Sequence, residues 1–175
     1  IKRANVVIEK VPLITMDEQL RNRYIAEASF LRGLFYFDLA RAFGGVPKVT
    51  TTTPATKIPR SSDDEIFQLV ISDLEFAAQN LPEKSLYGPD DAGRATKGAA
   101  KALLARVYLF LGDFENVEKY ALEVIVSDEY DMEAVFTDAN GKNGEHGVES
   151  VFEIGAMEVE GAGGNQYANT QGVRG

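Results

Sequence analysis

The chain has 175 residues, of which 45% are hydrophobic, and a formal net charge of −9, which suits one acidic globular domain. Nucleic acid and anionic membrane surfaces are poor partners for it, because both attract clustered lysine and arginine. No run approaches the ~20 apolar residues of a membrane-spanning helix. The absence of cysteine excludes disulfides and cysteine-ligated metals but leaves the cellular compartment open.

The first expected helix covers residues 1–11. Its apolar side chains recur at helical spacing until Pro12 interrupts the pattern: Ile1, Ala4, Val7, Ile8 and Val11. The chain starts inside this pattern and without methionine. We therefore expect the sequence to be part of a longer protein.

The stretch Thr15–Pro47 predicts a long central helix with a Gly-Gly-x-Pro stop at its end. Thr15 and Glu18 have the spacing of a capping box at its start. Two lines of apolar residues run along it, one of Leu20, Tyr24, Ala28, Leu31, Phe35 and Leu39, the other of Phe30, Leu34 and Phe37. A helix that is apolar on two faces must be covered on both, so Leu31→Asp is expected to be severely destabilising.

Residues 44–60 hold three prolines and four consecutive threonines, which predicts an extended, non-helical connection. Ser62 and Glu65 form a second capping box, and the helix that follows carries an apolar stripe up to Pro82. Residues 82–95 contain Gly and Pro and are expected to form a loop.

Thr96 is expected to cap a helix that ends at Gly112, and Asp113 a further helix that runs to about Ser127. This pair has the spacings of a tetratricopeptide unit, carried by Leu104, Ala105, Tyr108, Gly112, Phe114, Val117 and Ala121. Lys101 stands where such a unit usually has Trp, and Val117 where it usually has Ala. Two packed helices without a named repeat are the alternative.

After residue 130 the sequence becomes polar and rich in Gly and Asn, although residues 149–154 could form a short strand. The predicted fold class is therefore all-α in the main, a tetratricopeptide-like α-α superhelix with long loops and a short strand near the C-terminus. Residues 1–130 are expected to be the helical scaffold, and residues 131–175 the start of a truncated, loop-rich region.

Metal chemistry finds little support. His146 is the only histidine, so we expect it to be an exposed loop residue rather than a ligand. The segment Asp138–Glu149 partly follows a calcium loop. Lys142 places a cation at a ligating position of that loop, and Asn143 replaces its turn glycine, which argues against an EF-hand. A looser calcium site stays open, and no metal site is predicted.

Catalysis is not expected either. The paired carboxylates Asp63/Asp64 are explained by the positive end of a helix dipole, and Asp90/Asp91 lie in a polar loop with nothing that promises their burial. The sequence contains no G-x-S-x-G, P-loop or dinucleotide-binding motif. The protein is therefore predicted not to be an enzyme and to need no cofactor.

Ligand-binding aromatic residues should stand in loops, since those of the long helix are spaced for a core. Two clusters qualify: Tyr87 beside Arg94, and Tyr167 beside Asn165 and Gln166. Amide side chains suit sugar hydroxyls because each amide both donates and accepts hydrogen bonds. For each cluster the alternative is an ordinary solvated loop.

Four segments, in order, resemble the SusD/RagB family. Ala26–Pro47 (AEASFLRGLFYFDLARAFGGVP) is very similar to the family hallmark, and Ile66–Pro82 resembles the helix that follows it in the family. Gly93–Leu111 and Glu149–Ile154 (ESVFEI) resemble the next two signatures. The resemblance covers most of the chain.

This resemblance implies a non-catalytic surface lipoprotein of the outer membrane, built on tetratricopeptide-like helical pairs. Its expected partners are a SusC-like, TonB-dependent outer-membrane transporter and an oligosaccharide or other nutrient, with the membrane reached only through an N-terminal lipid anchor absent from this chain. The resemblance also implies that the chain alone binds sugars weakly. The alternative is a helical-repeat protein–protein adaptor without a sugar ligand.

Overall fold

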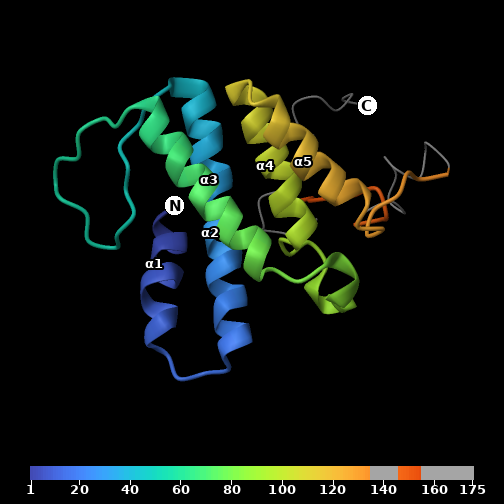
Figure 1. Ribbon diagram of the computed structural model, residues 1–175. Helices are drawn as coiled ribbons and strands as arrows, with labels where there is room; N and C mark the ends of the chain where they lie inside the picture. The colour runs from blue at the N-terminus through green and yellow to red at the C-terminus, as the bar shows by residue number, and fades with distance from the viewer. Residues whose placement is uncertain (135–145, 155–175) are drawn as a thin grey trace, which may run out of the picture.

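The computed structural model describes residues 1–134 and 146–154, where all regular structure is helical (Figure 1). There are five α-helices in these residues: α1 (Lys2–Lys10), α2 (Glu18–Phe43), α3 (Asp63–Asn80), α4 (Lys97–Leu111) and α5 (Phe114–Ile125). Each helix packs against the next one along the chain, as in solenoid proteins built from stacked helical pairs. The predicted all-α class is confirmed. None of these helices combines the length and apolarity needed to cross a membrane.

Helix α2 begins two residues later than its capping box implied. The N-cap is Asp17, whose carboxylate accepts a hydrogen bond from the Leu20 amide at 2.9 Å. Asp17 competes with Thr15 for this role, and a charged acceptor at the positive end of the helix is the stronger of the two. The predicted end is confirmed, since Gly44 adopts a φ of 70° immediately after Phe43.

The two apolar lines of α2 have different environments. Phe30 and Phe37 are each 1% exposed and form part of the core against α3, whereas Leu31 is 38% and Phe35 43% exposed. Helix α1 lies over the line that includes Leu31 and Phe35, but it has only nine residues and leaves a groove of about 690 Å³ that these two residues line. Both faces are therefore covered, as expected, but the cover over Leu31 and Phe35 is incomplete.

The exposure of Leu31 changes what we expect of Leu31→Asp. Since more than a third of Leu31 already contacts solvent, the aspartate can reach water. We expect a loss of about 1 kcal/mol in the free energy of unfolding, measured by urea denaturation. Leu31→Ala, as a control, isolates the lost packing. A loss above about 3 kcal/mol would restore the original burial argument.

A buried polar network joins three helices and the connection after α2. The Arg32 guanidinium makes two hydrogen bonds of 2.7 Å to the Asp73 carboxylate and one of 3.0 Å to Asn5 Oδ1. Asn5 Nδ2 then donates to the carbonyl oxygens of Val49 and Thr51. Because Asn5 is fully buried and its amide satisfied on both sides, it fixes the extended connection against α1 and α2.

The α4–α5 pair has the predicted helical-hairpin turn. Gly112 takes the left-handed conformation with a φ of 77°, and the Asp113 carboxylate caps α5 by accepting from the Asn116 amide. Across the pair, the rings of Tyr108 and Tyr120 stack with centroids 5.7 Å apart. Helix α5 ends at Ile125, two residues before the predicted end.

The predicted strand at residues 149–154 was wrong. These residues form turns and bends in which their polar groups bind locally or to loops, not to a neighbouring strand. The Ser150 carbonyl accepts from Lys84 Nζ, and Glu153 binds back to His146. Phe152 of this segment packs edge-on against Phe30 of α2.

Candidate functional site

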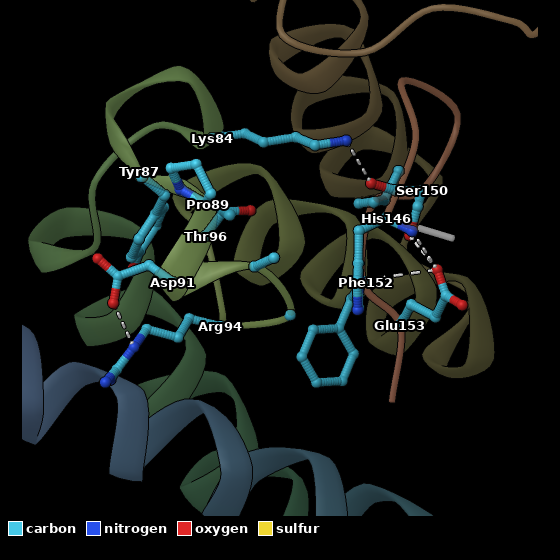
Figure 2. A pocket seen from close by; sticks show the side chains of 14 residues that line it. Lys84, Tyr87, Pro89, Asp91, Arg94, Thr96, His146, Ser150, Phe152 and Glu153 are labelled. Atoms are coloured by element: carbon cyan, nitrogen blue, oxygen red, sulfur yellow. Dashed lines mark hydrogen bonds and ion pairs between the residues drawn. The ribbon is translucent and has the colours of Figure 1, made fainter. Parts of the chain in front are cut away.

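A pocket of about 330 Å³ opens between the α3–α4 loop and the segment 146–154 (Figure 2). We call it the Tyr87 pocket. Residues 84–96 form one wall and residues 146–153 the other. Its volume lies at the lower end of the range of about 300–1,000 Å³ typical of ligand pockets, and its lining is mainly apolar with a few charged groups.

Tyr87, one of the predicted ligand residues, lies in the first wall. Its hydroxyl donates a 2.8 Å hydrogen bond to the Ala95 carbonyl, and the Arg23 guanidinium of α2 lies 4.5 Å from its ring centroid. Both contacts hold the ring in one orientation. Burial, reinforced by the nearby Glu27 carboxylate, raises the pKa of Tyr87 to about 12.

Arg94, the second predicted residue of this cluster, is held by two carboxylates. Its Nε lies 2.7 Å from Asp91 Oδ1, and its Nη1 donates to Glu27 Oε2 at 2.8 Å. Arg23 joins the same cluster, because it contacts Glu27 at 3.0 Å and Asp91 at 3.1 Å. These ion pairs hold the loop that carries Tyr87 against α2. The Asp91 carboxylate also lines the pocket.

The second wall is secured by Lys84. Its ammonium group donates to the carbonyls of Gly147 at 2.6 Å and Ser150 at 2.9 Å, so one side chain bridges both walls (Figure 2). Burial lowers the pKa of Lys84, while the surrounding glutamates oppose that shift. Glu153 stands on the second wall and accepts from the His146 amide at 3.0 Å and the Ser150 hydroxyl at 3.2 Å.

His146 lies in a loop, as predicted, but it is only partly exposed. Its side chain is 27% exposed, its Nδ1 lies 3.8 Å from Glu153 Oε2, and its imidazole packs onto Gly93 of the opposite wall. A Cβ at Gly93 would lie 3.1 Å from the imidazole Cε1, so glycine permits this close approach. Within the described ranges, no three or more potential ligand side chains gather as a metal site would require.

Some of the remaining predicted residues lie outside the part of the chain that the structure describes, and others lie within it. Asn165, Gln166 and Tyr167, together with Asp138 and most of the calcium-like loop, lie outside the described residues. Asp63 begins α3, as predicted, and also accepts a 2.8 Å hydrogen bond from the Gly45 amide.

Sequence reasoning did not propose several lining residues as ligand contacts, among them Lys84, Asp91, His146, Phe152 and Glu153. Lys84 and the carbonyl groups that it binds are separated by more than 60 residues. A single sequence carries no local signal for such a pairing. Only the aromatic Tyr87 beside a cation in a Gly- and Pro-containing loop gave a usable indication.

The raised pKa of Tyr87 predicts a loss of stability at alkaline pH. Between its unfolded pKa of about 10 and its folded pKa of about 12, the unfolded state loses the phenol proton first, which favours unfolding. We expect the free energy of unfolding of the wild type to fall relative to that of Tyr87→Phe between pH 10 and 12. Urea denaturation at pH 9 and pH 11 measures this difference. Parallel pH dependence of the two proteins would contradict the assignment.

In comparisons with known proteins, the chain matches SusD-like proteins. The profile of a SusD-like family, described as "Starch-binding associating with outer membrane", matches residues 1–109. SusD-like protein P2 of Formosa agariphila is 30% identical, over 98% of this chain and 35% of its own length.

Solved structures agree with this match. A SusD-like protein from Bacteroides fragilis superimposes with a TM-score of 0.79 and 31% identity, over 87% of this chain and 31% of that chain. A laminarin-binding SusD-like protein superimposes with a TM-score of 0.75 and 30% identity, over 82% of this chain and 34% of that one. The chain thus spans about a third of the length of these relatives.

Proposed function

Because the chain belongs to the SusD-like family, we propose that the whole protein is a non-catalytic glycan-binding protein of the outer-membrane surface. The observation that carries this proposal is the family match over residues 1–109, whose description joins starch binding to the outer membrane. The laminarin-binding relative of similar fold supports an oligosaccharide as the ligand class. In this proposal residues 1–130 act as the helical scaffold, and residues 131–175 begin a loop-rich region.

Two further parts of the proposal concern the cellular location of the protein and its transporter partner. We infer that the protein is a surface-exposed lipoprotein and that it passes oligosaccharides to a SusC-like, TonB-dependent transporter. Support comes from the family description, which places its members with the outer membrane. Protease added to intact cells should remove the protein from the surface, and detergent extraction should recover it with the transporter. A protein protected inside the cell would overturn this part.

Within this function, we assign glycan contact to the Tyr87 pocket. It combines an aromatic wall with carboxylates that can accept hydrogen bonds from sugar hydroxyls. Asp91 and Glu153 provide the acceptors, and Arg94 is held in place by its ion pairs. Asn165, Gln166 and Tyr167 remain proposed contacts on the basis of sequence alone.

Isothermal titration of the full-length protein with starch, laminarin and xyloglucan oligosaccharides tests the ligand class. We expect at least one of these glycans to bind. If none binds and peptides do, the protein is an adaptor instead.

One observation favours this adaptor alternative. Helix α5 exposes apolar side chains to solvent: Phe114 is 70% and Ile125 71% exposed. A protein partner would cover such a face.

A further inference from the structure

The charged groups of the Tyr87 pocket balance one another. Four of its lining side chains carry formal charge, namely the cations Lys84 and Arg94 and the carboxylates Asp91 and Glu153. The pocket therefore has no excess positive charge to offer an anionic ligand. This balance bears on which glycans can enter it.

Both cations are already engaged by the protein. Arg94 forms ion pairs with Asp91 and with Glu27, which is not among the lining residues. Lys84 donates hydrogen bonds to two backbone carbonyls and is also attracted electrostatically by the nearby Glu129 carboxylate. A sulfate or carboxylate on a ligand would have to compete with these partners and would meet Glu153 as a like charge, which is unfavourable.

The remaining lining suits an uncharged sugar ring. Tyr87 and Pro89 on one wall and Phe152 on the other supply apolar surface for the C–H groups of a ring (Figure 2). Carboxylate oxygens accept strongly from hydroxyl groups, since charge-assisted hydrogen bonds are about twice as strong as neutral ones. A volume of about 330 Å³ has room for one or two rings, not for a long chain.

We propose that the Tyr87 pocket binds one or two rings of a neutral sugar and discriminates against uronic acid and sulfated sugars. This inference rests on the proposed glycan-binding function and narrows its substrate class. The Glu153 carboxylate sets the selectivity, because Asp91 is already paired with Arg23 and Arg94. Lys84 acts as a positioning residue, since it holds the second wall through backbone carbonyls instead of facing the ligand as a free cation.

Matched pairs of small ligands test the selectivity in the full-length protein. The probes are the methyl glycosides of glucose, galactose and mannose, each compared with its uronic acid counterpart at pH 7 by saturation-transfer NMR and titration. We expect the neutral member of the bound pair to bind at least about tenfold more tightly. Equal or tighter binding of the uronic acid would overturn the inference while leaving glycan binding intact.

Glu153→Gln provides the site-specific arm of the test. Glutamine retains an acceptor for the Ser150 hydroxyl and the His146 amide but removes one negative charge. We expect the preference for the neutral glycoside to fall about threefold or more, with the melting temperature unchanged. The matched control is Glu118→Gln on α5, outside the pocket lining, which should leave the preference unchanged.

Two further outcomes separate the inference from the proposed function. If glycosides bind equally well to the wild type and to Tyr87→Leu, the pocket assignment fails although the protein binds glycans. If neither glycosides nor long oligosaccharides bind the full-length protein, both the inference and the proposed function fail. Loss of neutral glycoside binding in folded Tyr87→Leu supports the inference.

Discussion

Replacing Asp73 by asparagine is expected to lower the free energy of unfolding by about 3 kcal/mol, because it leaves the Arg32 guanidinium buried without a counter-charge. Arg32 is 7% exposed and Asp73 6% exposed, and two hydrogen bonds of 2.7 Å join them. For a chain of this size, the corresponding shift in melting temperature is roughly 10 °C. Thermal and urea denaturation followed by circular dichroism measure it.

Two controls separate the effect of burial from that of charge. Asp38→Asn removes an exposed partner of Arg41, at 3.7 Å, and should change stability by less than about 0.5 kcal/mol. Burial raises the pKa of Asp73, and its hydrogen bonds to Arg32 oppose that shift. In buried ion pairs generally, the desolvation cost of the two charges offsets most of their attraction. The double replacement Arg32→Met/Asp73→Leu should therefore be much less harmful than Asp73→Asn alone. If Asp73→Asn lowered the free energy of unfolding only slightly, the Arg32–Asp73 pair would not be excluded from water as the structure indicates.

Gly45→Ala is the second change with a large expected effect. An added Cβ would fall well inside van der Waals contact with the Ser61 carbonyl oxygen, a backbone atom that cannot rotate away. The Ser61 amide donates to the Val46 carbonyl at 3.1 Å, and the Gly45 amide to Asp63, so the two ends of the connection are held together at this point. Separating them should cost about 3 kcal/mol.

Gly88→Ala is the matched control. No atom lies within 4 Å of a Cβ built at Gly88, and its φ of −79° suits alanine. This variant should be neutral or more stable by up to about 1 kcal/mol. Denaturation of both variants under the same conditions gives the comparison. Equal stability of the two would show that the ends of the connection can move apart freely.

Local features of the sequence predicted the helices well. Ser62 caps α3 in a full capping box with Glu65, and Thr96 caps α4 by accepting from the Ala99 amide, both as expected from a few neighbouring residues. The start of α2 was misplaced because Thr15 and Asp17 are both capping residues only two positions apart. Short-range patterns could not decide between them.

Long-range features were less accessible. Leu31 is exposed because α1 is short. The spacing of apolar residues in α2 carries no information about the length of α1. The bond between Arg32 and Asp73 spans 41 residues, and a single sequence gives no sign of such a partner. Of the candidate ligand residues, Tyr87 and Arg94 line the same pocket wall, whereas the second wall is brought there only by the fold; that these residues contact a ligand stays a prediction.

A crystal structure of the full-length protein with a bound neutral oligosaccharide tests the central claim most directly. The account predicts a sugar ring in the Tyr87 pocket, between Tyr87 and Phe152, with hydroxyl groups hydrogen-bonded to Asp91 or Glu153. A glycan bound elsewhere, with the Tyr87 pocket filled by other residues of the protein, would contradict it.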